Sequence, residues 1–379
     1  MTKNIKGYIE KNKDEAIALL ISLAQIPAPS NNETMRAEFI LNWLNAQGIS
    51  DAYIDDKLNV VYPIGINEDN PVYVFMAHTD VVFADEDALP VLVEEKVIRC
   101  PGICDNTANV VALMMAAKYI TNNNMIPQNC GVVIVFNSGE EGLGNLKGCR
   151  KIMEQFRGRV VEFISFDSPN RECVSRSVGS KRYRIEVITK GGHSYNNFGE
   201  KNAIEVLANI ISKLYLVNLP PKGKTTYNVG VIEGGTSVNT IAQKAHMLYE
   251  YRSDDEDSLL YMERYFKNTI KEFESEDVKI IATLVGERPC AQNIDKEKQA
   301  NLKTRAAEVY RSYYGNDICF VSGSTDCNIP MSEGIPSVCV GCCIGRGAHT
   351  REEYVEIDSI APGMGVCCEL ITHCFEKRN

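Results

Sequence analysis

The chain has 379 residues, more than a single hydrophobic core usually supports, so its length predicts two domains. Hydrophobic residues make up 44% and charged residues 24% of the sequence, which excludes the disordered, collagenous and membrane-spanning classes. The formal net charge of −10, with no clustered basic run, argues against a nucleic-acid partner.

The first elements along the chain predict a sheet covered by helices. Helices are expected at 14–24 and 34–47. Continuous apolar runs at 72–77 and 131–136 are typical of strands buried on both faces of a mostly parallel sheet. The apolar stretch 110–120 between them suits a crossover helix. Together these elements predict a doubly wound α/β domain.

Near Val178 the pattern changes to strand, helix, strand, strand, helix, strand, the order of a ferredoxin-like split β-α-β-β-α-β unit. Its expected elements are 182–189, 203–215, 227–232, 245–252, 257–274 and 278–285. A helix at 296–313 and a buried strand at 337–340 then return to the pattern of the first part of the chain, in which helices alternate with buried strands.

We therefore predict an α/β fold with a doubly wound, mostly parallel catalytic domain formed by residues 1–178 and 287–379. An α+β domain of residues 179–286 is inserted into it.

The cysteines and the start of the sequence bear on where the protein works. The 14 cysteines include adjacent pairs in apolar runs, such as Cys342-Cys343, which favours buried free thiols over a disulfide scaffold. The chain starts with charged sequence of helical character, without the apolar core and cleavage site of a secretory signal. We expect a cytoplasmic protein with no membrane partner.

Acidic and histidine side chains follow the predicted strands of the larger domain. His78 and Asp80 end the strand 72–77, and open α/β sheets gather ligands beyond the carboxyl ends of their strands. Glu140 and Glu141 follow the strand 131–136, and adjacent carboxylates repel unless a cation lies between them. Taken alone, each residue also fits a solvated strand end or turn.

Three further residues fall at comparable places. Asp105 precedes the crossover helix, where it could serve only as an N-cap. Asp167 ends a predicted strand at 161–166, where it could merely begin a turn, and His349 follows the strand 337–340. Jointly, His78, Asp105, Glu141, Asp167 and His349 describe a cluster of three carboxylates and two imidazoles.

These motifs, in this order, resemble those of the co-catalytic metallopeptidases that include peptidase T, carboxypeptidase G and aminoacylase, the M20/M25/M40-type peptidases. The matching segments are His78-x-Asp80, Asp105-Asn106, Glu140-Glu141-Gly142, Asp167, Gly345-x-Gly347-x-His349-x-x-x-Glu353, Gly191-Gly192-His193-Ser194 and Gly234-Gly235-Thr236-Ser237-Val238-Asn239-Thr240-Ile241. The resemblance spans essentially the whole chain. One departure follows the aspartate, where Asn106-Thr107-Ala108-Asn109 replaces the commoner acidic-lysine-glycine run and leaves the substrate open.

The resemblance implies two divalent metal ions per chain, zinc or alternatively cobalt or manganese. Asp105 would bridge them, with His78 and Asp167 completing one site and Glu141 and His349 the other. Four positive charges, three carboxylates and one bridging hydroxide leave such a site near neutral, which suits a partly buried pocket.

The other site residues take their roles from the same resemblance. Glu140 would act as the proton shuttle for a metal-bridged hydroxide, and Asp80 would orient His78. His193 would stabilise the oxyanion, supplied by the partner subunit of a homodimer formed through the inserted lid domain. The candidate substrate-binding residues are Asn239, Arg252 and Ser324, although Arg252 alternatively makes only a structural salt bridge.

Three functions remain open from the sequence. The leading hypothesis is an exopeptidase that cleaves the amide bond of short peptides, as an aminopeptidase, dipeptidase or tripeptidase. A deacylase of N-acyl amino acids would use the same site. A non-catalytic binding protein of the same fold is the third reading, but such a protein could lose Glu140 or a ligand, and this chain retains them all.

Overall fold

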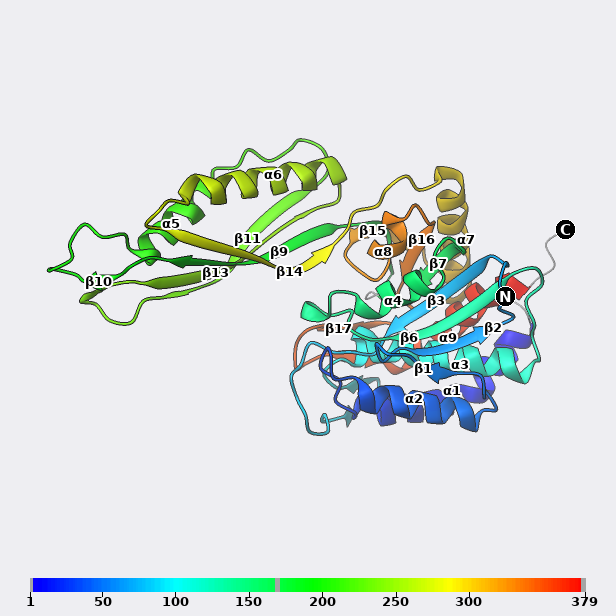
Figure 1. Ribbon diagram of the computed structural model, residues 1–379. Coiled ribbons are helices and arrows are strands. Elements are labelled where there is room, and N and C mark those ends of the chain that lie inside the picture. Colours follow the sequence, from blue (N-terminus) through cyan, green and yellow to red (C-terminus); the bar gives the residue numbers. More distant parts are fainter. Residues whose placement is uncertain (1–2, 168–170, 376–379) are drawn as a thin grey trace. The chain divides into compact units, whose positions relative to one another are not determined.

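The computed structural model describes residues 3–167 and 171–375, which form two compact units (Figure 1). The larger unit consists of residues 1–177 and 293–379, and the smaller of residues 178–292. The sequence predicts residues 287–292 in the larger domain, whereas the structure assigns them to the smaller unit. The reason is that strand β14 (Lys279–Arg288) extends the smaller sheet and Cys290 is buried in its core.

An eight-stranded sheet with the order β1-β2-β6-β3-β7-β16-β8-β15 forms the centre of the larger unit. In its middle, β3 (Val72–His78) lies between β6 (Gly131–Asn137) and β7 (Val160–Ser165), and β16 (Ser337–Val340) continues beyond β7, all parallel. Every residue of β3, β6 and β16 is buried. The predicted doubly wound, mostly parallel α/β sheet is confirmed.

The outer strands are mostly antiparallel. On one side β2 (Val60–Ile64) pairs with β6, and β1 (Tyr53–Ile54) pairs with β2. On the other side β8 (Glu172–Ser177) pairs antiparallel with β16 and parallel with β15 (Cys319–Gly323), which forms the edge. These strands were not predicted from the sequence.

Helices cover the sheet on both faces. Figure 1 shows the first three helices together on one side of β2, β3 and β6, with α4 on the other side. Helix α3 is buried on nearly all sides, as its continuous Val, Ala, Leu and Met sequence requires, because it contacts the sheet as well as α1 and α9. The helices are α1 (Lys3–Ala24), α2 (Thr34–Ala46), α3 (Ala108–Asn122), α4 (Lys147–Gln155), α7 (Lys296–Tyr314), α8 (Asn328–Ser332) and α9 (Ile357–Thr372). Among the described residues, no helix is long and apolar enough to cross a membrane.

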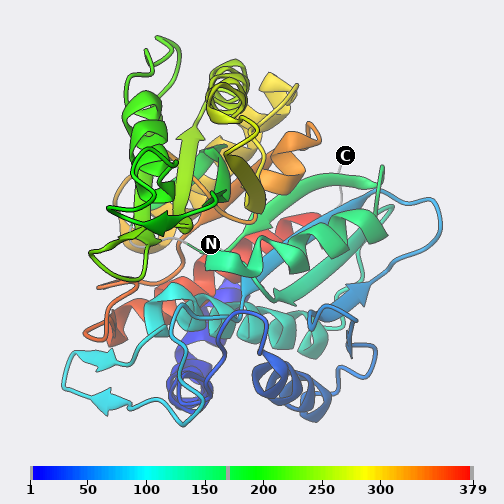
Figure 2. The same cartoon turned by 60° about the vertical axis from the view of Figure 1, so that its left-hand side comes forward.

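The smaller unit is a four-stranded antiparallel sheet with the order β11-β13-β9-β14, covered on one face by two helices (Figures 1 and 2). Alternate residues of β9 and β13 face these helices, and the ring of Tyr183 lies 4.4 Å from that of Phe266. The order of elements is that of the predicted ferredoxin-like unit. They are β9 (Gly179–Ile188), α5 (Ala203–Leu214), β11 (Thr225–Gly234), β13 (Lys244–Ser253), α6 (Glu256–Phe273) and β14, with a separate ladder of β10 (Gly192–His193) and β12 (Thr240–Ile241).

Close helix packing generates a stability prediction at Gly365 of α9, where an added Cβ would overlap the ring of Tyr313. We expect Gly365→Ala to lower the free energy of unfolding by about 1–3 kcal/mol, since overpacking forces neighbouring groups to shift. Gly7→Ala in α1 is the matched control, because its Cβ would meet nothing within 4 Å and alanine favours a helix by roughly 0.5–1 kcal/mol. Urea unfolding measures both, and equal stability of the two variants would contradict the packing at α9.

Candidate metal centre

The five predicted ligands come together at the carboxyl edge of the central sheet. His78 ends β3, Glu141 and Asp167 follow β6 and β7, and Asp105 lies in a π-helical turn just before α3. His349 lies in the turn between β17 (Gly345–Arg346) and β18 (Tyr354–Glu356). The sheet topology thus places five residues distant in sequence around one point, as expected for a doubly wound fold.

Asp105 lies between the two imidazoles. Its Oδ1 is 3.1 Å from His78 Nε2, and its Oδ2 is 3.2 Å from His349 Nε2. Each carboxylate oxygen therefore faces a different histidine. The peptide bond from Asp105 to Asn106 is cis.

The carboxylates of Asp167 and Glu141 lie near different histidines. Asp167 Oδ2 lies 3.9 Å from His78 Nε2, and Glu141 Oε1 lies 3.0 Å from His349 Nε2. Ligand atoms of His78, Asp105 and Glu141 all lie within 4.8 Å of one another. The donors form two groups that share Asp105, and imidazole nitrogens with carboxylate oxygens suit zinc and related divalent ions.

The electrostatics of the cluster favour positive charge. Hydrogen bonds to Asp105 and Glu141 raise the pKa of His349 to about 10. Burial lowers the pKa of His78, but Asp105 and Asp80 outweigh it and hold that pKa well above its ordinary value. Burial also raises the pKa of Glu141. Carboxylates this close together repel, and bound cations would relieve that repulsion.

Asp80 is completely buried behind the ligands. Its carboxylate accepts hydrogen bonds from the backbone N–H groups of Glu140 (3.0 Å) and Glu141 (2.9 Å) and from the Ser30 hydroxyl (2.6 Å). The Nδ1 atom of His78 lies 3.5 Å from Asp80 Oδ1 and 3.1 Å from its backbone oxygen. Burial acts to raise the pKa of Asp80, but His78 and Ser30 lower it overall. Asp80 thus joins the end of β3 to the turn that carries both glutamates.

Glu353 fixes the turn that carries Asp105. Its Oε1 accepts from the N–H groups of Cys104 and Asp105, and its Oε2 from Gly102, each at 2.7 Å. Glu353 is fully buried, and this burial raises its pKa to about 7 although the N–H groups act in the opposite direction. The loops of Asp105 and His349 touch here, and a Cβ on Gly345 would overlap the side chain of Cys104.

Glu140 is buried beside the ligand cluster, 5% exposed. Next to it, Asp326 is also buried and accepts a hydrogen bond of 2.8 Å from Asn137 at the end of β6. Burial raises the pKa of Asp326 well above its ordinary value, and the charge of Glu140 raises it further. Ser324, half-buried, lies two residues before Asp326 in the loop between β15 and α8.

The remaining predicted residues lie in the smaller unit. His193 pairs with Thr240 across the β10–β12 ladder, and just beyond the ladder the Ser194 N–H donates to the Asn239 backbone oxygen at 3.0 Å. Arg252 is the second-last residue of β13, and its guanidinium donates two hydrogen bonds to the carboxylate of Glu250, at 2.9 and 3.0 Å. The structure thus brings the segments that carry His193 and Asn239 together, and it shows Arg252 in the salt bridge that the sequence left as its alternative.

Sequence reasoning missed several residues that support the cluster. Ser30 and Asn137 carry no distinctive pattern, and Glu353 was noted only as part of the His349 motif. Arg36 did leave a signal, because it occupies the buried stripe of α2 that continues through Ile40 and Leu44.

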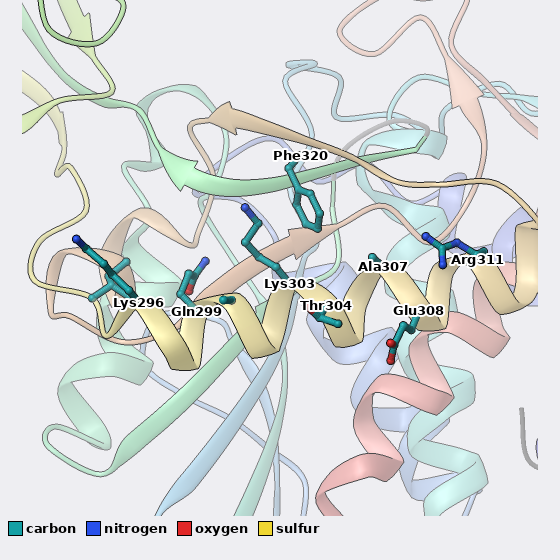
Figure 3. A pocket seen from close by; sticks show the side chains of 10 residues that line it. Lys296, Gln299, Lys303, Thr304, Ala307, Glu308, Arg311 and Phe320 are labelled. Atoms are coloured by element: carbon teal, nitrogen blue, oxygen red, sulfur yellow. The ribbon is translucent and has the colours of Figure 1, made fainter.

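A separate groove of about 570 Å³ lies between α7 and β15, where Lys303 Nζ is 4.4 Å from the centre of the Phe320 ring (Figure 3). Its lining residues include one acid, Glu308, and no histidine or cysteine. This groove does not overlap the carboxylate and histidine cluster.

The larger unit carries a candidate site for divalent metal ions at the carboxyl edge of its sheet, and the smaller unit is inserted into the larger one in sequence. Residues 74–373 match peptidase family M20/M25/M40, and the chain belongs to this family.

Similar proteins agree with this assignment. A "Peptidase M20 domain-containing protein" of Schizosaccharomyces pombe is 27% identical over 61% of this chain and 58% of its own length, so the match spans less than two thirds of that relative. A "probable succinyl-diaminopimelate desuccinylase" of Staphylococcus aureus is 22% identical over 92% of this chain and 94% of its own.

Solved structures show the same fold. A tripeptidase of Staphylococcus aureus superposes with a TM-score of 0.76 at 20% identity, covering 96% of this chain and 99% of the other. A dinuclear metal-binding peptidase of family M20 from Bacillus subtilis gives 0.66 at 18% identity, covering 96% and 98%.

The three N–H groups on Glu353 generate a prediction. Glu353→Gln offers one acceptor oxygen and one NH₂ group, so at least one N–H of the Asp105 turn loses its partner. We expect the free energy of unfolding to fall by about 1–3 kcal/mol in urea titrations, the usual penalty for an unsatisfied buried donor. Glu352→Gln, which changes an exposed neighbour, should leave stability unchanged. Equal stability of the two variants would show that Glu353 does not hold the turn.

Proposed function

We propose that this protein is an exopeptidase that cleaves short peptides with two divalent metal ions, zinc or alternatively cobalt or manganese. The observation that carries the proposal is the Asp105 carboxylate, whose two oxygens face different imidazoles while Asp167 and Glu141 flank opposite sides. A shared carboxylate with a separate histidine and acid on each side fits a pair of ions.

In this proposal His78, Asp105 and Asp167 hold one ion, and Asp105, Glu141 and His349 hold the other. The bound ions supply Lewis acidity, which makes water acidic near neutral pH and polarises a carbonyl group. The protein holds the ligands in place through Asp80 and Glu353, which are buried and hydrogen-bonded to the ligand-bearing backbone.

Glu140 is the proposed proton shuttle. Its carboxylate is buried beside the ligands, and its backbone N–H is fixed by Asp80. It would take a proton from the attacking water and deliver it to the nitrogen of the leaving amine. The raised pKa of the neighbouring Asp326 favours its neutral form, which limits repulsion between the two acids.

The proposed oxyanion donor is His193. Its Nδ1 accepts a hydrogen bond of 3.2 Å from the N–H of Tyr195, so a neutral imidazole there carries its proton on Nε2, the atom that would donate to an oxyanion. A cavity of about 410 Å³ in the smaller unit is lined by Gly192, adjacent to His193, and by Thr240, adjacent to Asn239. We propose that Asn239 and Ser324 bind the substrate and that Arg252, engaged by Glu250, has a structural role.

A deacylase of N-acyl amino acids is the second candidate. It is favoured by the similarity to a probable desuccinylase over 92% of this chain. The tripeptidase from Staphylococcus aureus and the aminopeptidase from Bacillus cereus, with TM-scores of 0.76 and 0.73, favour peptides. Assays with tripeptides, dipeptides and N-succinyl and N-acetyl amino acids under identical metal conditions separate the two.

The state of the cysteines bears on the cellular compartment in which the protein works. The structure has the 14 cysteines as thiols, not as disulfides, and all but Cys319 are buried. We propose the reducing cytoplasm as the site of action.

The adjacent glutamates provide the sharpest test of the mechanism. The unaltered protein should contain about two ions per chain after incubation with zinc, cobalt or manganese. Glu140→Gln should keep both ions and the folded state while the catalytic rate falls roughly 100-fold or more, since only the proton shuttle is removed. Glu141→Gln should lose about one ion, and excess metal should partly restore its activity.

These measurements combine metal analysis with turnover of the best substrate from the panel. If the unaltered protein binds no ion, the two-metal proposal is wrong. If both variants lose metal equally, or if Glu140→Gln stays nearly fully active, the shuttle belongs to another residue.

A homodimer formed through the smaller unit is proposed as well. Strand β11 is an edge of the four-stranded sheet, and Ile232 on it is 53% exposed. Close in sequence, Leu216 is 73% and Leu219 48% exposed in the segment that joins α5 to β11. Apolar groups beside an open strand edge favour association with a second copy.

Light scattering at micromolar concentration should report a dimer, and Ile232→Glu should shift it to a monomer by placing a charge at the contact. Leu260→Glu on α6, another exposed apolar position of the same unit, is the matched control and should leave the dimer intact. A monomeric unaltered protein would contradict the proposal, and His193 would then have to act within its own chain.

A further inference from the structure

Arg36 is a buried arginine next to the candidate metal centre. It is 1% exposed and occupies the stripe of α2 that continues through Ile40 and Leu44, where an apolar residue would be expected. Burial lowers its pKa to about 10, so the guanidinium remains a cation at neutral pH. Taking this charge out of water is unfavourable unless specific interactions compensate for it.

The contacts of Arg36 link the two segments that carry ligands. Its Nη1 donates to the backbone oxygen of Thr79 at 2.9 Å and to the hydroxyl of Thr107 at 3.1 Å. Thr79 lies between His78 and Asp80, and Thr107 ends the turn that carries Asp105. One nitrogen atom therefore connects the end of β3 with the Asp105 turn.

Two further observations explain how the guanidinium is held. Its Nε donates to the backbone oxygen of Ile26 at 2.8 Å, which fixes it relative to the chain before α2. The charges of the buried Asp80 and Glu353 favour its charged form. These are the same two carboxylates that hold the backbone of Glu141 and Asp105.

A purely structural role would not require this arrangement. Anchoring α2 needs only the bond to Ile26, and an apolar residue in the stripe would pack without burying a charge. Among the described residues, Nη2 has no hydrogen-bond partner, so the site does not satisfy the guanidinium fully. The buried guanidinium instead fixes the distance between the end of β3 and the turn that carries Asp105.

We propose that Arg36 is a positioning residue for the metal centre, which sets the separation of His78 and Asp105 by binding Thr79 and Thr107 at once. The inference rests on the proposed function, since it concerns ligands of the proposed ions. Loss of Arg36 should weaken the site formed by His78, Asp105 and Asp167 more than the site formed by Asp105, Glu141 and His349, because only the first site contains both His78 and Asp105.

The test uses the full chain and zinc alone, with affinities from competition against a chromogenic chelator. Arg36→Lys keeps the charge but cannot reproduce the planar fork. Thr107→Val leaves the arginine in place but removes its hydroxyl partner, together with the 2.6 Å hydrogen bond that this hydroxyl donates to the Gly102 backbone oxygen. We expect each variant to bind one of the two zinc ions about 10- to 100-fold more weakly, the usual effect of losing a group that orients a ligand.

The two changes act on one connection, so the doubly substituted protein should lose less affinity than the product of the two separate losses. Ile40→Val is the matched control. Ile40 lies one turn further along the same buried stripe, and its side chain cannot donate a hydrogen bond to Thr79 or Thr107 as Arg36 does. Ile40→Val should lower the melting temperature of the zinc-free protein without changing zinc affinity.

The outcomes separate this inference from the proposed function. If the unaltered protein binds no zinc, both fail together. If it binds two ions and Arg36→Lys and Thr107→Val bind them with unaltered affinity, only the role of Arg36 is wrong. Equal affinity losses in Ile40→Val and Arg36→Lys would likewise reduce Arg36 to a general support of the core.

Discussion

The repulsion between carboxylates gathered at one edge of a sheet is the constraint on which the rest of this structure depends. Asp105, Glu141 and Asp167 lie around two imidazoles, and the Asp105 carboxylate faces both of them. Such a group of acids is stable only with positive charge among them. The raised pKa values of His78 and His349 express that requirement, and two dications would meet it more completely than two protons.

Holding the ligands in place requires further buried charge. Asp80 and Glu353 bind the backbone N–H groups of the two acid-bearing turns, and Arg36 lies close to both of these carboxylates. None of these groups would be favourable in the core alone, because an isolated buried ion loses its hydration. Together they form a network of opposite charges and hydrogen bonds around the backbone that carries the metal ligands.

The sequence predicted those features that depend on local pattern. Apolar runs such as 72–77 and 131–136 became buried parallel strands, and acids and histidines at strand ends became neighbours because parallel strands end at one edge. Strands such as β1 and β8 could not be predicted, because β1 has only two residues and β8 mixes buried and exposed positions without a regular period, so pairing fixes them rather than composition. The function of Arg36 depends on Thr79 and Thr107, which are 43 and 71 residues away. The boundary after Gln292 depends on the tertiary packing of Cys290 and could likewise not be predicted from the sequence.

In the smaller unit the charged side chains and the proposed substrate-binding groups lie on different elements. Its central strands carry arginines that are each matched by an acid: Arg252 and Arg182 approach Glu250, and Arg184 approaches Glu186. A substrate carboxylate would have to compete with Glu250 for the fork of Arg252, at a loss of that internal pair. The β10–β12 ladder instead offers the imidazole of His193, and the amide of Asn239 directly precedes strand β12. Within the proposed function, discrimination between a peptide and an acylated amino acid therefore depends on hydrogen bonds from such side chains, because a polar group left without a partner in the wrong complex weakens binding.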